Sequence, residues 1–154
     1  MKAMGLPEGP FTPFQPKDNY MWRDLERRAG LRGLPYRKPS VYPVNSLLTG
    51  RIGLVAARDG WCPEFTRQTF RGHFVEGKII GEETSISDAL NSLGRDPEQI
   101  VAAAQAPENK DALREQTEKA ASIGIFGSPS FVVGGELYWG DDRLEDAMDW
   151  AMNR

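Results

Sequence analysis

Apolar residues recur at helical spacing along most of this chain, and short runs of proline and glycine separate the helical segments. Met21 and Leu25 lie on one such apolar stripe and Asp18 offers an N-cap, so the pattern predicts a helix over residues 18–29. The preceding residues 1–17 contain four prolines, a density that no helix tolerates, and we expect a non-helical arm there.

The same signals predict six further helices, separated by breaks such as Asp59-Gly60. Asp96 stands before Pro97 as an N-cap before a proline at the first helical position, and Asp141 is the cap expected for the last helix. These helices are expected at residues 45–58, 64–76, 85–93, 97–106, 108–122 and 142–152. The inner stripe of the last helix is predicted to be Leu144, Ala147, Met148 and Ala151.

Near the C-terminus the pattern changes to that of strands. Phe131–Val133 and Glu136–Trp139 are β-branched and aromatic runs, and the two glycines between them are typical of a two-residue hairpin turn. Pro129 stands at the mouth of the first strand, where we expect a cis Ser128–Pro129 bond. That bond would leave the backbone groups of Ser128 free to pair with an extended peptide ligand.

The composition narrows the function classes. The chain has 154 residues, 40% of them hydrophobic and 27% charged, as expected for one ordinary globular domain. A formal net charge of −3 argues against a nucleic-acid partner. No apolar run reaches the roughly 18 residues of a membrane span. No secretory leader is recognised and a single cysteine cannot form an internal disulfide, so we expect a cytoplasmic protein.

Three motifs, taken in order, resemble one protein family. Residues 124–135 read Gly-x-Phe-Gly-x-Pro-x-Phe-x-Val-x-Gly and are followed by Trp139-Gly-Asp-Asp-Arg143, while Tyr20–Arg27 and Tyr42–Ser46 lie upstream. Together they resemble the 2-hydroxychromene-2-carboxylate isomerases, which are relatives of kappa-class glutathione transferases and of DsbA-like thioredoxin-fold proteins. The resemblance covers nearly the whole chain.

The resemblance implies an α+β, mostly helical chain: a partial thioredoxin-like fold, consisting of the C-terminal β-hairpin plus helix, with a large all-helical insert. We expect the arm at 1–17, the insert at 18–123 and the C-terminal part of the thioredoxin-like domain at 124–154, in one structural unit. In the family an N-terminal βαβ segment carries a nucleophile-activating serine, and we expect this sequence to lack that segment. A natural short form and a truncated fragment both fit.

Glutathione is the cofactor that the resemblance implies. It places Ser128 and Pro129 against the cysteinyl part of the tripeptide, and the segment Trp139, Gly140, Asp141 and Asp142 at the γ-glutamyl end. The chemistry agrees, because a helix N-terminus donates N–H groups to a carboxylate and an acidic side chain there can hold an ammonium group. The alternative is that Asp141 only caps a helix and Ser128-Pro129 only forms a turn.

Asn45 and Lys2 are the residues that the resemblance places near a small aromatic carboxylate substrate. A lysine suits a carboxylate as a compact point charge. The alternatives are that Asn45 caps a helix and that Lys2 is a solvated side chain. Cys62 is expected to be a partly buried thiol without a catalytic role, because the chain has no Cys-x-x-Cys pair. His73 is the only histidine, so we expect no metal site and place it at a helix surface or core edge.

The expected function is that of a glutathione-dependent cis-trans isomerase of the 2-hydroxychromene-2-carboxylate type, impaired because the family serine has no counterpart. Two alternatives stay open: a non-catalytic glutathione- or peptide-binding module, and a DsbA-like oxidoreductase relative. The hairpin would form the edge of an incomplete sheet, and a homodimer is one way to cover it.

Overall fold

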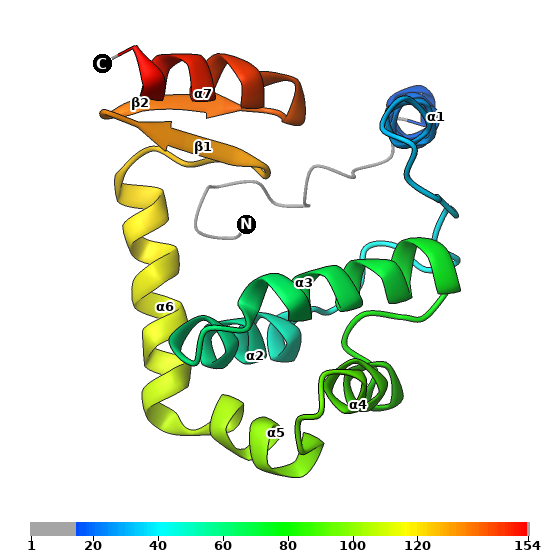
Figure 1. Cartoon of the computed structure of the whole chain (residues 1–154), viewed down its shortest axis with the longest axis vertical. Coiled ribbons are helices and arrows are strands. Elements are labelled where there is room, and N and C mark those ends of the chain that lie inside the picture. Colours follow the sequence, from blue (N-terminus) through cyan, green and yellow to red (C-terminus); the bar gives the residue numbers. More distant parts are fainter. Residues whose placement is uncertain (1–14, 154) are drawn as a thin grey trace. The chain divides into compact units, whose positions relative to one another are not determined.

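The computed structural model describes residues 15–153, so Lys2 lies outside the described residues. Contacts along the chain divide it into two compact units, one ending at Leu113 and the other beginning at Arg114. The helices and strands, labelled in Figure 1, are α1 (Gln15–Leu31), α2 (Leu47–Arg58), α3 (Cys62–Arg71), α4 (Glu83–Ser92), α5 (Pro97–Gln105), α6 (Pro107–Ser122), β1 (Ser130–Val133), β2 (Glu136–Trp139) and α7 (Leu144–Met152). None of these helices is long and apolar enough to cross a membrane.

The first unit is built on four helices that pack in a cycle. Helix α2 contacts both α3 and α5, and α4 contacts the same two helices. Ile52 and Val55 of α2, Phe65 of α3 and Leu90 of α4 are buried at the centre of this cycle. Each of these residues lies on the apolar stripe of its helix, so the helical periodicity read from the sequence is also the pattern of burial.

Local signals set several of the helix boundaries as predicted. The Asp96 carboxylate accepts hydrogen bonds from the backbone N–H groups of Glu98 and Gln99, with Pro97 at the first helical position. Gly60, at φ +81°, follows the end of α2. The hairpin glycines, Gly134 and Gly135, also have positive φ, a backbone conformation that residues with a side chain rarely adopt. They join β1 to β2 as predicted.

Other boundaries differ from the prediction. Helix α1 begins at Gln15 rather than Asp18, because Pro16 falls in its first turn, where a missing N–H costs nothing. Helix α4 begins at Glu83 rather than Ser85. The segment predicted as one helix to Glu76 changes at Arg71 to a π-helical turn, Gly72–Glu76.

Of the two positions predicted for His73, the structure contradicts the helix surface. His73 is only 2% exposed, because the π-helical turn directs it inward. Its Nδ1 lies 2.9 Å from the carbonyl oxygen of Lys78. A carbonyl can only accept a hydrogen bond, so Nδ1 carries the proton.

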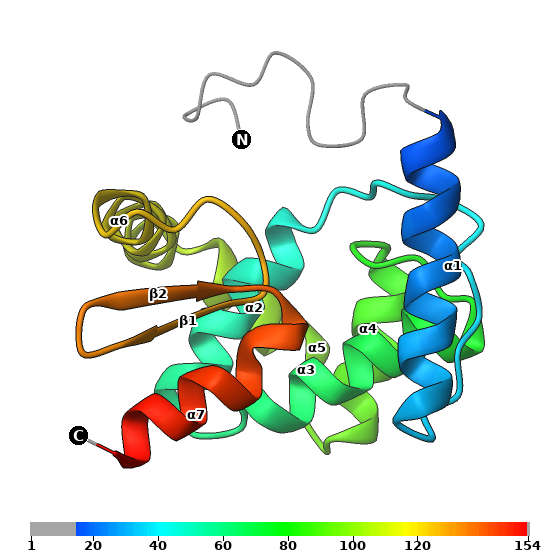
Figure 2. The same cartoon turned by 90° about the horizontal axis from the view of Figure 1, so that it is seen from above.

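The second unit contains the hairpin and α7. Strands β1 and β2 pair antiparallel, with Ser130 opposite Trp139 and Val133 opposite Glu136. Helix α7 packs on this hairpin, and Figure 2 shows the two elements side by side. Within the predicted inner stripe of α7, Ala147 is buried, but Met148 is 53% exposed and Ala151 is also exposed, so those two positions were predicted wrongly.

Candidate functional site

The turn before β1 contains the predicted cis peptide bond, between Ser128 and Pro129. Ser128 and Pro129 are exposed. Among the residues that the structure describes, the backbone N–H and carbonyl of Ser128 have no hydrogen-bond partner. The Ser128 N–H can therefore donate one hydrogen bond to a ligand and its carbonyl can accept one, as strand addition by a peptide requires.

A second segment, the end of β2, lies beside this turn. The N–H of Gly140 donates to the carbonyl of Pro129 at 3.0 Å, just beyond the last strand pair. The Trp139 indole, 55% exposed, lies so close to Gly127 that a Cβ at that position would collide with the indole nitrogen. The structure thus brings Ser128, Pro129, Trp139 and Gly140 together on one end of the hairpin.

The acidic residues that follow lie in a 3₁₀ turn, Asp141–Arg143, rather than at the cap of an α-helix. Asp141 therefore does not cap α7, which begins at Leu144; the residue before that helix is Arg143, and its side chain makes no capping bond. Gly140, at φ +118°, enters the turn in a conformation open only to glycine, and a Cβ there would meet the Asp142 carboxylate.

Arg143 carries a positive charge beside the acidic residues of this turn. Its guanidinium lies 3.5 Å from the Asp142 carboxylate and 2.8 Å from that of Asp146. The hydrogen bond to Asp146, with the charge of Asp142 beside it, raises the pKa of Arg143 further. Both carboxylates are exposed and can exchange this partner for a ligand group at small cost.

Asn45 belongs to the first unit, and the helix-capping alternative describes its contacts. Its Oδ1 accepts a hydrogen bond from the N–H of Leu47, the first residue of α2, at 3.1 Å. The Asn45 carbonyl lies so close to Gly81, at φ +91°, that no Cβ fits there. The side chain is exposed, so capping leaves its amide nitrogen available for other contacts.

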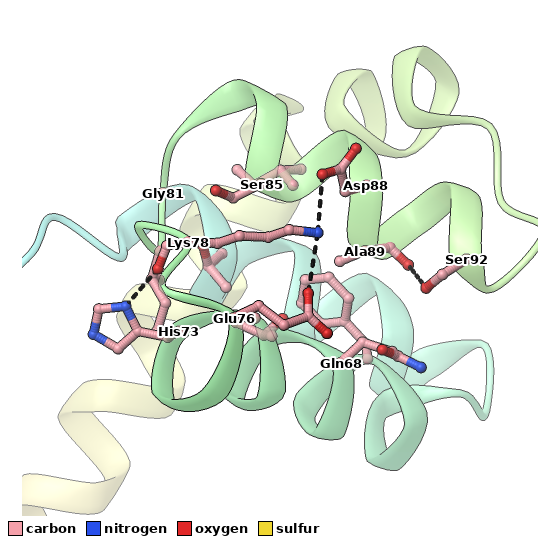
Figure 3. A pocket seen from close by; sticks show the side chains of 15 residues that line it. Gln68, His73, Glu76, Lys78, Gly81, Ser85, Asp88, Ala89 and Ser92 are labelled. Atoms are coloured by element: carbon pink, nitrogen blue, oxygen red, sulfur yellow. Dashed lines mark hydrogen bonds and ion pairs between the residues drawn. The ribbon is translucent and has the colours of Figure 1, made fainter. Parts of the chain in front are cut away.

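The first unit also contains a polar hollow of about 150 Å³ between α3 and α4, which was not predicted from the sequence. Figure 3 shows the Lys78 side chain extended between Glu76 and Asp88. Its Nζ lies 3.2 Å from Glu76 and 3.0 Å from Asp88, and Arg71 also pairs with Glu76 at 3.0 Å. Arg71, Glu76 and Asp88 lie on helical segments and Lys78 on the connection after the π-helical turn, and no motif in the sequence marks them.

The charges of this hollow stabilise one another. The hydrogen bond from Arg71, and then that from Lys78, lowers the pKa of the Glu76 carboxyl. The hydrogen bond to Asp88, and then that to Glu76, raises the pKa of Lys78. Glu76 and Lys78 therefore both remain charged over the middle of the pH range.

Neither unit offers a redox or metal centre among its described residues. Cys62 is half-buried, as predicted, with its Sγ 3.8 Å from the Thr66 hydroxyl. No group of three histidine, cysteine or acidic side chains in residues 15–153 is placed to hold a metal ion. The chemistry that the described residues offer is recognition by backbone, aromatic and acidic groups.

Comparison with known proteins identifies the family. The sequence matches the DSBA-like thioredoxin domain over residues 1–149. This chain therefore belongs to the DSBA-like thioredoxin family, and the predicted family and mostly helical fold class are confirmed.

Its relatives are named for glutathione transfer and isomerisation. The chain is 30% identical to glutathione S-transferase kappa 2 of Caenorhabditis elegans, over 87% of this chain and 66% of that protein. It is 22% identical to a 2-hydroxychromene-2-carboxylate isomerase of Sphingobium xenophagum, over 84% of this chain and 66% of that protein. It thus spans about two thirds of the length of these relatives.

A solved structure of a 2-hydroxychromene-2-carboxylate isomerase aligns with a TM-score of 0.86 at 26% identity. The alignment covers 99% of this chain and 73% of that one. The helical unit and the hairpin unit both fall within the aligned region, because almost the whole chain is covered.

Proposed function

We propose that this chain binds glutathione at the end of the hairpin, in the service of a 2-hydroxychromene-2-carboxylate type of cis-trans isomerisation. The observation that carries the proposal is the Gly140–Pro129 hydrogen bond, which holds the segment Trp139–Asp142 beside Ser128, whose backbone has no partner within residues 15–153. The family membership and the names of the relatives support the same reading.

The residues present suit the tripeptide. Ser128 would pair its backbone with the cysteinyl part, as an added strand does, and Pro129 would lie beside it. The Trp139 ring would border the ligand, and Gly140 lets the chain turn closely past it. Asp141 and Asp142 would hold the ammonium group of the γ-glutamyl end, where the first turn of a helix also leaves N–H groups for its carboxylate.

Bound glutathione would supply a thiolate that adds reversibly to the conjugated carbonyl system of a small aromatic carboxylate. We propose Asn45, and Lys2 outside the described residues, as the contacts of that substrate. Lys2 would provide a positive charge for the carboxylate, and Asn45 an amide N–H for a developing negative oxygen. As part of the same proposal, residues 18–123 form a helical insert, and the protein is cytoplasmic and forms a homodimer.

Calorimetric titration of the full chain with glutathione tests the binding site. Asp142→Asn should weaken binding about tenfold, as expected for loss of a charged hydrogen bond. Asp149→Asn is the matched control, because Asp149 is an exposed acidic residue further along α7, and it should leave the affinity unchanged. Absence of binding by the unchanged chain would overturn the proposal.

A turnover assay with 2-hydroxychromene-2-carboxylate and glutathione tests the chemistry. We propose that these 154 residues by themselves react slowly, because none of them matches the family serine that activates the thiol. A rate close to that of a complete isomerase would refute this part.

The alternative function is a binding module that holds glutathione or an extended peptide without catalysis. The observation that favours it is that the described residues of the hairpin end supply hydrogen-bonding and acidic groups, with no cysteine and no histidine among them. Binding without turnover, even at high enzyme concentration, would select it. A DsbA-like oxidoreductase would instead form a mixed disulfide through Cys62, which mass spectrometry after thiol trapping would detect.

A further inference from the structure

Two hollows lie side by side in the first unit. The first is the polar hollow around Lys78, shown in Figure 3. The second, which we call the apolar hollow, has a volume of about 320 Å³ and lies between α2 and α3. The residues that line both are Thr49, Phe65, Thr69 and Ile80.

The apolar hollow has the size and surface that an aromatic ring requires. Gly50 and Gly53 of α2 form one side, and Phe65 and Phe70 of α3 form the other. A Cβ on Gly53 would meet nothing within 4 Å, so the space beside this glycine is open. A cavity of about 150 Å³ is enough to hold benzene in a protein interior, so one substituted ring fits.

Thr49 lies where the two hollows meet, and two buried polar atoms in the lining, the Thr49 hydroxyl and the Nε2 of His73, have no partner among the described residues. The Thr49 Oγ1 is buried and has no hydrogen-bond partner among the described residues. Buried hydroxyls are almost always hydrogen-bonded, because leaving one unmatched is costly. This hydroxyl can both donate and accept, so a ligand hydroxyl in either orientation satisfies it.

The charges of the polar hollow already have partners, so none of them calls for an ionic ligand. The Lys78 ammonium is already shared by Glu76 and Asp88, and Arg71 holds the other side of Glu76. An anion would have to displace a carboxylate from Lys78, and a cation would face Lys78 itself. A neutral polar group avoids both costs.

We propose that this double hollow is a binding site for a neutral hydroxylated aromatic molecule of the phenol class. Its ring lies between the glycines of α2 and the phenylalanines of α3, and its hydroxyl bonds to Thr49 at the entrance of the polar hollow. This site consists of residues of the first unit, whereas the proposed glutathione residues all belong to the second.

The test is titration of the full chain with 4-ethylphenol, in the absence of glutathione, followed through the methyl signals of Ile80, which lines both hollows, in a methyl NMR spectrum. Ethylbenzene lacks the hydroxyl, and 4-ethylbenzoate replaces it by a charge. We expect saturable binding of 4-ethylphenol, with both other probes at least about tenfold weaker. No saturable binding, or equal binding of ethylbenzene, would overturn the proposal.

Two variants locate the bound molecule. Gly53→Leu fills the apolar hollow without disturbing a special backbone conformation and should abolish 4-ethylphenol binding. Thr49→Val keeps the shape of the side chain but removes the hydroxyl, and should weaken binding about tenfold while leaving ethylbenzene unaffected. Thr84→Val is the matched control, because Thr84 is exposed on α4 and lines neither hollow.

Fold and binding are measured separately in these variants. Because the Thr49 hydroxyl has no protein partner among the described residues, Thr49→Val should unfold at the same temperature as the parent or slightly higher. A Thr49→Val protein that is folded and binds 4-ethylphenol with unchanged affinity would refute the proposed hydroxyl contact. None of these measurements involves glutathione or turnover. The phenol-site proposal can therefore be refuted without refuting the proposed isomerase function, and the reverse is also true.

Discussion

Each of the two units of this chain is stabilised internally in a different way. The first buries a cluster of apolar side chains, among them Ile52, Val55 and Leu90, which are at most 1% exposed. In the second unit Ala147 is the one apolar side chain within the described residues that reaches comparable burial, at 3%. Large apolar side chains such as Trp139 and Met152 are 55% and 70% exposed there.

The comparison teaches that the two units should respond to different substitutions. Burial of apolar surface stabilises the first unit, so removing volume from its core is costly. The second unit depends on backbone geometry: strand pairing, glycines at positive φ and the Gly140–Pro129 bond. Its candidate site consists of these same backbone features, so recognition and local fold depend on the same groups.

The largest difference is expected from truncating an apolar side chain in each unit. Leu90→Ala should lower the free energy of unfolding by about 2–5 kcal/mol, because Leu90 is fully buried. Val132→Ala in β1 should cost less than about 1 kcal/mol, because Val132 is 43% exposed. Urea denaturation followed by circular dichroism measures both, and equal losses would mean that the units do not differ in this way.

Asparagine side chains give a second comparison. Asn109 is 5% exposed, and its amide donates to the carbonyls of Arg51 and Ala104 at 3.0 Å each. Asn109→Ala should cost about 2 kcal/mol, about 1 for each buried bond. Asn153 donates to the Asp149 carbonyl at 2.9 Å but is exposed, so Asn153→Ala should cost no more than about 0.5 kcal/mol. Thermal unfolding of the two variants would show whether burial sets this difference.

Glycine substitutions should show the dependence of the second unit on its backbone. Gly135→Ala introduces only the strain of positive φ, about 1 kcal/mol, because a Cβ there meets nothing within 4 Å. Gly140→Ala adds a collision with the Asp142 carboxylate and should cost up to about 2 kcal/mol. Of the two, only Gly140→Ala should also weaken glutathione binding in calorimetry. Equal affinities would separate the fold of this turn from the proposed site.

The smallest effect concerns pH and the charges around Lys78. The pKa of Glu76 is lowered by Arg71 and Lys78, so its contribution to stability is present above the ordinary glutamate pKa and is lost as pH falls through the lowered value. The pKa of Lys78 is raised, so its contribution is lost only as pH rises through that higher value. Glu76→Gln should therefore differ slightly from the parent near neutral pH and converge with it in acid. A difference that does not shrink as the pH falls below the ordinary glutamate pKa would contradict this assignment.

Much of the fold could be predicted from the sequence, because its signals are local. Asp96-Pro97 specifies the start of α5 by a side-chain cap and a proline that needs no N–H. The paired glycines specify the hairpin turn, since both have positive φ in the structure. The prediction was wrong where the same residue is compatible with two helix boundaries. Pro16 can precede a helix or lie in its first turn, and in the structure it lies in the first turn of α1.

The candidate sites divide in the same way. The residues of the hairpin end lie close together in sequence on both sides of one turn, so Ser128, Pro129, Trp139 and Gly140 could be named from the motif. The double hollow could not, because it combines Thr49 of α2 with Phe65 of α3 and Asp88 of α4. No spacing along the chain indicates that these three helices meet.

The sequence by itself determined the helices, the hairpin turn and the family, because each depends on neighbouring residues or on a motif read in order. Only the tertiary structure decided which polar groups are withdrawn from water. The π-helical turn buried His73, and the packing of α2 on α3 buried the Thr49 hydroxyl without a described partner. The physical reason is that burial depends on what the other helices cover, which periodicity along one helix does not specify.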